Sequence, residues 1–191
     1  MKIIDLSREI SEETEVYPGD PPIEISPWAK IEEDGYYMNI LKMGEHAGTH
    51  VDAPAHFIMG GETIDRLPLD KFVGEGVVVD VRGGKGHIRA EEIPKNIRGM
   101  IVLLLTNGRE LSKEASERLV RENVKAVGTD SLTIGNEEVH KILLSAKIPI
   151  FEGLTNLEEL LGKEFLFIGF PLKIKRGSGS PIRAVAIIGG I

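Results

Sequence analysis

The pattern of apolar and polar positions divides the chain into two parts near residue 75. In the second part, short apolar runs typical of buried strands alternate with segments in which apolar residues recur every three or four positions, as on one helix face. The strand-like runs cover residues 76–82, 100–106, 125–129, 148–152, 164–170 and 182–188. This alternation of strands and helices predicts an α/β fold.

Helix start signals precede three of the intervening segments. Ser112 and Asn136 can each accept a hydrogen bond from a free backbone N–H group in a first helical turn. Thr155, with Glu158 three residues later, has the spacing of a capping box and predicts a third, shorter helix. The apolar stripes of the first two helices are Ala115, Leu119 and Val120, and Val139, Ile142, Leu143 and Ala146. Beyond these helices, K-R-G-S-G-S-P, from Lys175 to Pro181, is interpreted as a flexible connection.

The first part of the chain has weaker periodicity and more turn residues. A strand is predicted over 2–6, β-like runs over 28–33 and 36–43, and a short helix over 68–73. The proline-rich loop Y-P-G-D-P-P, from Tyr17 to Pro22, cannot join the interior of a sheet. We therefore expect one α/β domain over 1–191, with a mixed β-sheet core and flanking helices.

Composition narrows the function classes. The chain has 191 residues and a formal net charge of −7, which argues against a nucleic-acid or anionic-membrane partner. No apolar run approaches the length of a membrane span, and Asp5, Arg8 and Glu9 interrupt the start of the chain where a signal peptide would be apolar. A cytoplasmic location is therefore expected.

The absence of cysteine removes several kinds of chemistry together. With zero cysteines there are no disulfides, thiolate nucleophiles or cysteine-based zinc sites. The sequence also contains no G-x-S-x-G elbow of serine hydrolases, and its G-G-K-G turn lacks the spacing of a phosphate-binding loop. Any metal must be held by His, Asp and Glu side chains.

The densest group of such side chains is H-A-G-T-H-V-D-A-P-A-H, from His46 to His56. By composition alone an eleven-residue window should hold about 0.3 histidines, whereas this window holds three of the five in the chain. Pro54 excludes one regular helix. In extended chain His50 and Asp52 project to the same side, and Gly48 allows the backbone to turn His46 toward them. Imidazole and carboxylate together indicate a divalent metal site or proton transfer.

Two further residues are candidates on local evidence. Glu152 ends an apolar strand beside Gly153, where a carboxylate can face a cleft, although an exposed loop glutamate is the simpler interpretation. His140 lies beside a helix stripe, where a packed or surface histidine is the common case. His87, in G-K-G-H-I, has no partner pattern and is interpreted as a loop residue.

These segments resemble the cyclase family of metal-dependent hydrolases, which includes bacterial-type kynurenine formamidases and the similar isatin hydrolases. The eleven-residue segment fits the family pattern H-x-G-T-H-x-D-x-P-x-H at every fixed position. Four more segments, in the family's order, resemble its other motifs: Y-P-G-D-P-P, G-T-D-S-L from Gly128, F-E-G-L from Phe151 and G-S-G-S-P-I-R-A-V from Gly177. The resemblance covers most of the chain and implies a swivelling β/β/α fold.

The resemblance also implies roles for individual residues. His46, His50 and Asp52 would bind a first metal that Glu152 also reaches, and Asp52 and Glu152 would bridge to a second metal. His140 would complete this second site. Zinc or manganese both suit nitrogen and oxygen donors, with two ions per chain. The family's relatives are homo-oligomers, so a dimer or tetramer is expected.

Two more positions concern the substrate. His56 would be the proton donor and acceptor rather than a ligand. Tyr17 stands where kynurenine formamidases have a substrate-stacking tryptophan, and this departure leaves the acyl substrate open.

These parts indicate amide hydrolysis. A pair of divalent ions can lower the pKa of a bound water to about 7, and His56 can protonate the leaving nitrogen. The first hypothesis is an arylformamidase-like amidohydrolase that converts N-formyl-L-kynurenine to L-kynurenine and formate. The alternatives are a hydrolase or cyclase acting on another cyclic amide, imide, isatin or lactone, and a non-catalytic metal-binding module.

Overall fold

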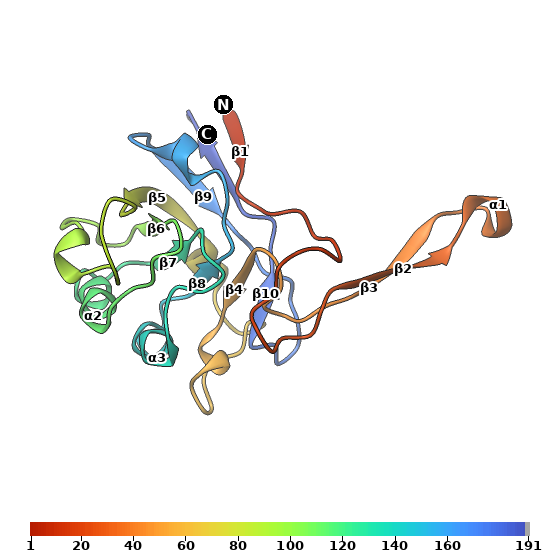
Figure 1. The fold of residues 1–191 in the computed structure, drawn as a ribbon, viewed down its shortest axis with the longest axis horizontal. Coiled ribbons are helices and arrows are strands. Elements are labelled where there is room, and N and C mark those ends of the chain that lie inside the picture. The colour runs from red at the N-terminus through yellow and green to blue at the C-terminus, as the bar shows by residue number, and fades with distance from the viewer. Residues whose placement is uncertain (190–191) are drawn as a thin grey trace.

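A single, strongly curled β-sheet forms the body of the protein. The computed structural model describes residues 1–189, and its nine-stranded sheet has the order β1-β11-β9-β5-β6-β7-β8-β4-β10 (Figure 1). The strands of this sheet are β1 (Lys2–Asp5), β4 (His50–Asp52), β5 (Val73–Asp80), β6 (Ile101–Leu105), β7 (Ala126–Thr129), β8 (Ile150–Glu152), β9 (Phe165–Ile168), β10 (Gly179–Pro181) and β11 (Val185–Ile188). Strands β5 to β8 run parallel, and the other pairings are antiparallel. The expected single domain with a mixed sheet and flanking helices is confirmed.

The parallel strands are buried on both faces, which explains their continuous apolar sequences. On one face, Val102 and Leu104 of β6 belong to a core shared with helices α2 (Lys113–Arg121) and α3 (Glu137–Ser145). The predicted caps form: the side chains of Ser112 and Asn136 accept hydrogen bonds from the backbone N–H groups of Ala115 and Val139. The two caps therefore fix where each helix begins.

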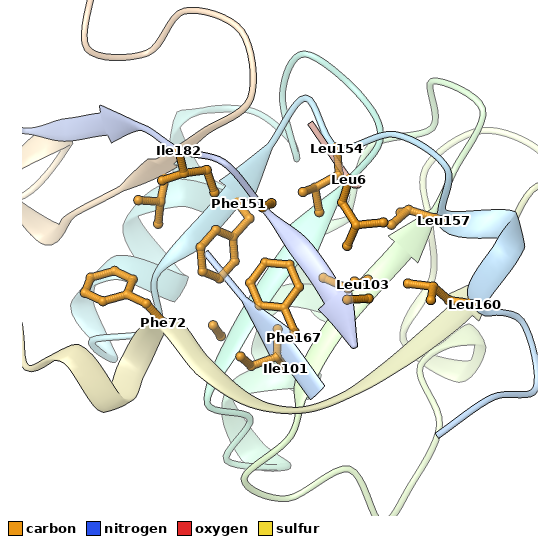
Figure 2. Close-up of a cluster of buried hydrophobic side chains, with 14 of the residues drawn as sticks. Leu6, Phe72, Ile101, Leu103, Phe151, Leu154, Leu157, Leu160, Phe167 and Ile182 are labelled. Atoms are coloured by element: carbon orange, nitrogen blue, oxygen red, sulfur yellow. The ribbon is translucent and has the colours of Figure 1, made fainter. Parts of the chain in front are cut away.

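The other face of the sheet packs on itself because the sheet curls. Figure 2 shows Phe72, Phe151 and Phe167 gathered in this core beside Leu103. The ring centroids of Phe151 and Phe167 are 4.7 Å apart, and those of Phe72 and Phe151 are 6.5 Å apart. Phe151 immediately precedes Glu152, so this aromatic packing anchors the strand end that carries a candidate ligand.

A hairpin extends away from the body. Strands β2 (Glu24–Ala29) and β3 (Met38–Lys42) form a separate two-stranded antiparallel sheet, and α1 (Ile31–Asp34) lies at its tip (Figure 1). The predicted run 28–33 is therefore wrong in its bounds. The helical turn interrupts it because the Asp34 carboxylate accepts a hydrogen bond from the Lys30 backbone N–H group and closes the turn.

Two other element predictions, both of helices, need correction. The predicted helix over 68–73 is a 3₁₀ turn at Leu69–Phe72, because β5 already begins at Val73. The Thr155 capping box does not form: Asn156 has a left-handed conformation and no side-chain cap, and a 3₁₀ turn covers Leu157–Leu160. The Thr155 backbone N–H group instead donates to the carbonyl of Leu6.

The interpretation of residues 175–181 as a flexible connection is also wrong. Its last residues form β10, which pairs with β4 along its whole length, so that Gly179 lies opposite Asp52. This pairing brings residues 179–181 beside the histidine-rich segment.

Candidate metal centre

Strand β4 carries two candidate metal donors, His50 and Asp52. It lies between β8 and β10, and its register places His50 directly opposite Glu152. His50 Nε2 lies 3.3 Å from Asp52 Oδ1 and 3.4 Å from Glu152 Oε2. All three side chains are buried. The two-residue spacing expected to put His50 and Asp52 on one side does so because both belong to this strand.

Helix α3 brings His140 to the same point. The His140 Nδ1–H group donates to the carbonyl of Asn136 at 3.0 Å, one helical turn earlier, which orients the ring. Its Nε2 atom then lies 3.2 Å from Glu152 Oε1 and 3.6 Å from Asp52 Oδ2. The side chain that caps the helix and the carbonyl that holds the ring belong to the same residue.

His46 approaches from the loop before β4. Gly48 has φ +66, the left-handed conformation that lets the backbone turn between His46 and His50. His46 Nδ1 lies 2.8 Å from Asp52 Oδ1, and His46 Nε2 lies 2.8 Å from the hydroxyl oxygen of Ser178. Asp52 therefore lies between the imidazole of His46 on the loop and that of His140 on α3.

These residues form two donor triads that share one carboxylate. His46, His50 and Asp52 form the first, and Asp52, His140 and Glu152 form the second; within each, the donor atoms lie within 4.8 Å of one another. Asp52 Oδ2 is buried without a hydrogen-bond partner in residues 1–189. A buried carboxylate oxygen left without a donor is costly. Together with the nitrogen and oxygen donors, it fits a divalent metal ion.

The charges in this five-residue cluster support the same interpretation. Burial favours neutral imidazole, but hydrogen bonds and charge from Asp52 and Glu152 outweigh it and raise the pKa of His50 to about 10. Burial likewise opposes the charged form of His140, and Glu152, with a smaller effect of Asp52, raises its pKa to about 9. Without a metal, protons on these two imidazoles therefore neutralise the two carboxylates.

The carboxylates respond in the opposite direction. Burial raises the pKa of Asp52, but hydrogen bonds from His46 and His50 outweigh it and hold the pKa well below its usual value. For Glu152, burial and the charge of Asp52 act to raise the pKa, and hydrogen bonds from His140 and His50 bring it below its usual value. The lowered pKa values favour the ionised form of both carboxylates, which is the form that binds cations.

A pocket of about 490 Å³ opens over the cluster. This volume is within the range of small-molecule sites. His56 lines it and stacks on His46, with ring centroids 3.8 Å apart, and burial lowers the pKa of His56. Tyr17 and Phe57 supply aromatic surface, and Leu132 and Asn136 also line the pocket. The pocket thus places aromatic side chains, and an imidazole whose neutral form burial favours, beside the candidate metal donors.

The structure brings together every candidate that the sequence singled out. The pocket contains Tyr17 and His56 as well as four cluster residues, and the fifth, Asp52, lies beneath them. Glu152 is only 5% exposed, so the exposed-loop interpretation is wrong. His87 takes no part in the cluster.

Sequence reasoning missed Glu45, Ser178 and Phe57. Phe57 and Glu45 flank the recognised motif on either side, and Ser178 stands between two glycines. Those glycines were the available signal of a close approach.

Within the described 189 residues, none of the helices has the length and apolarity needed to cross a membrane.

A family model and two related sequences match most of this chain. The family model "Cyclase", described as "Putative cyclase", matches residues 4–136. An uncharacterised protein of Methanocaldococcus jannaschii is 37% identical, covering 98% of this chain and 100% of its own length. A kynurenine formamidase of Salinibacter ruber is 33% identical, covering 97% of both chains.

Solved structures share the fold. Isatin hydrolase A from Ralstonia solanacearum superposes with a TM-score of 0.89 at 24% identity, covering 98% of this chain and 92% of the other. A structure described as a "Potential Metal-Dependent Hydrolase With Cyclase Activity" has a TM-score of 0.87 at 26% identity, covering 100% and 99%.

Proposed function

This chain belongs to the cyclase family, and we propose that it hydrolyses N-formyl-L-kynurenine to L-kynurenine and formate. The broader conclusion, a metal-dependent amide hydrolase, follows from its relatives and from the donor cluster. The formamide substrate is our more specific inference. It is supported by kynurenine formamidases at 33% and 28% identity that align with 97% and 96% of this chain.

One observation carries the proposal: two donor triads share Asp52 at the base of a pocket, and Asp52 Oδ2 is buried without a hydrogen-bond partner in the part of the chain that the structure describes. His46, His50 and Asp52 would hold one cation, with Glu152 also in reach. Asp52, His140 and Glu152 would hold a second. Zinc and manganese both suit this donor set.

Bound cations would supply Lewis-acid polarisation of the substrate carbonyl and lower the pKa of a water near it. The remaining work is done by the protein. Burial lowers the pKa of His56 and so favours its neutral form, whose ring can accept a proton and later deliver it to the leaving nitrogen. Delivery matters because an amide anion is a poor leaving group.

Tyr17 and Phe57 would position the substrate. Their rings give the pocket an aromatic surface against which an arylamine can stack. Tyr17 is smaller than the tryptophan that the family resemblance leads one to expect. A ring-opening reaction on a cyclic amide, imide, isatin or lactone is therefore the second candidate.

The test is a substrate panel on the purified, metal-loaded protein. N-formyl-L-kynurenine should be turned over at least tenfold faster, in kcat/KM, than isatin, a cyclic imide and a simple lactone. Faster turnover of any ring substrate would favour the second candidate. Metal binding without hydrolysis of any of them would favour a non-catalytic module.

A further inference from the structure

Two histidines in the cluster have tautomers fixed by backbone carbonyls. His50 Nδ1 lies 3.0 Å from the carbonyl of Gly48, and His140 Nδ1 lies 3.0 Å from that of Asn136. A carbonyl only accepts, so each Nδ1 must carry a proton. The Nε2 lone pair of each ring is therefore the one that can face a cation.

His46 has the reverse orientation. Its Nδ1 atom faces Asp52, and its Nε2 atom faces the hydroxyl of Ser178, both at 2.8 Å. A serine hydroxyl can donate or accept, so this contact alone leaves the tautomer of His46 undetermined.

Glu45 removes this ambiguity. Its Oε2 atom accepts hydrogen bonds at 2.8 Å from both the backbone N–H and the hydroxyl of Ser178. The hydroxyl has one proton, and a carboxylate cannot donate, so the proton of Ser178 points to Glu45. The Ser178 oxygen must then accept from His46 Nε2–H. In the metal-free protein His46 Nδ1 donates to Asp52 Oδ1, and a bound cation would replace that proton at Nδ1.

The backbone around Ser178 is shaped for this contact. A Cβ atom on Gly177 would lie 2.9 Å from Glu45 Oε1, and one on Gly179 would lie 2.5 Å from His46 Cε1. Both distances are too short for a side chain. Glycine on each side of Ser178 therefore allows the segment to close over Glu45 and His46.

We propose that Glu45 and Ser178 are positioning residues that hold His46 as the Nε2–H tautomer, so that Nδ1 is its metal-binding atom. The inference rests on the proposed metal site and adds its tautomer and its supporting pair. Partners of this kind typically change metal affinity by 10–100-fold when removed.

Two measurements on the full chain test the proposal, and neither requires substrate. The first is zinc affinity, measured by competition with a chelator, for the parent, Ser178→Ala, Glu45→Gln and Ser178→Thr. Ser178→Ala and Glu45→Gln should each bind zinc 10–100-fold more weakly, whereas Ser178→Thr keeps the hydroxyl and should stay within about threefold of the parent. The second is long-range ¹H–¹⁵N NMR of the zinc-loaded parent, which should show Nε2–H with Nδ1 coordinated for His46, and the opposite pattern for His50.

Ser180→Ala is the matched control. It removes a hydroxyl in the same segment that bonds to Leu172 and Pro181 rather than to the cluster, so its zinc affinity should equal the parent's. Glu45→Gln keeps the proposal testable if Ser178→Ala fails to fold. His46 coordinated through Nε2, or parental affinity in both Ser178→Ala and Glu45→Gln, would overturn it.

The result also separates this proposal from the proposed function. A parent protein that binds no divalent metal contradicts both. Tight zinc binding with the wrong His46 tautomer contradicts the positioning role alone, and the substrate panel can still succeed.

Discussion

His56 and His46 have stacked rings 3.8 Å apart, yet they differ in what surrounds them. His46 contacts Asp52 and Ser178, whereas His56 lines the open pocket and burial lowers its pKa. Two adjacent imidazoles can therefore have different roles: in the proposed function one would hold a cation, and the other would move a proton.

This difference gives a first prediction. His56→Ala should lower kcat by roughly 10²–10⁴-fold, the usual contribution of a general acid–base group, while the metal content stays at the parent level. Asp52→Ala should lose both metal and activity, because both triads share this carboxylate. Metal analysis and steady-state kinetics on the same preparations check the split. Parental turnover by His56→Ala would contradict its role.

A second prediction concerns pH. The pKa values of His50 and His140 in the metal-free protein are raised to about 10 and about 9, so both rings hold protons at pH 7. A cation must displace those protons, and its affinity should therefore fall as the pH decreases. Calorimetric titration with zinc in buffers of different ionisation enthalpy should show net proton release at pH 7. Affinity independent of pH between 6 and 8 would contradict this.

At the level of residues, the sequence indicated the candidate donors that lie close together in the chain, but not the residues that position them. His46, His50, Asp52 and His56 fall within eleven residues, so their density was visible. Glu45 and Ser178 could not be identified in this way, because their hydrogen bond joins residues 133 positions apart in the sequence. Residues joined only by tertiary structure leave little trace in local composition.

At the level of elements, local rules found most helices and strands but not their neighbours. The caps of α2 and α3 formed as predicted, since capping depends on residues three positions apart. The placement of β4 between β8 and β10 depends on how the sheet curls, which no local pattern encodes. The capping box at Thr155 failed because a backbone hydrogen bond to Leu6 competes for that segment.

The turn after β8 gives an element-scale prediction. Gly153 has φ +67, and a Cβ atom there would lie 2.7 Å from the carbonyl oxygen of Gly48. Gly153→Ala should therefore lower the free energy of unfolding by more than the roughly 1–2 kcal/mol that the left-handed conformation costs. The substitution should also weaken zinc binding, because Gly153 directly follows Glu152 and packs against Gly48 in the loop before His50.

Gly162→Ala is the matched control. Gly162 has φ +69, and a Cβ atom there meets nothing within 4 Å, so only the conformational cost applies. Denaturant unfolding of the two variants, with zinc titrations alongside, separates the clash from the conformation. Equal losses of stability would show that the Gly48 contact does not matter.

At the scale of the whole molecule, the hairpin β2–β3 stands out. Trp28 and Tyr37 are 62% and 66% exposed there, and Ile40 and Leu41 are also exposed. An isolated two-stranded hairpin is marginally stable in water, and exposed apolar patches commonly mark protein contacts. Both features agree with the homo-oligomer expected from the family resemblance, which stays a prediction.

The corresponding prediction concerns mass in solution. Light scattering should give at least two chains for the parent protein, and Trp28→Glu combined with Tyr37→Glu should shift it toward one chain. Met59→Glu changes a fully exposed apolar residue outside the hairpin and should leave the mass unchanged. A parent protein with the mass of one chain would contradict the expectation.

The position of β4 between β8 and β10 also has a consequence for synthesis on the ribosome. The histidine-rich segment leaves the exit tunnel long before Glu152, which pairs opposite His50, and before Ser178, which lies 132 positions after His46. In a nascent chain the imidazoles of this segment therefore remain without these partners until both residues have emerged. Tight capture of a cation would become possible only after β4 has paired with β8 and β10, so a bound ion would report that this part of the sheet has assembled.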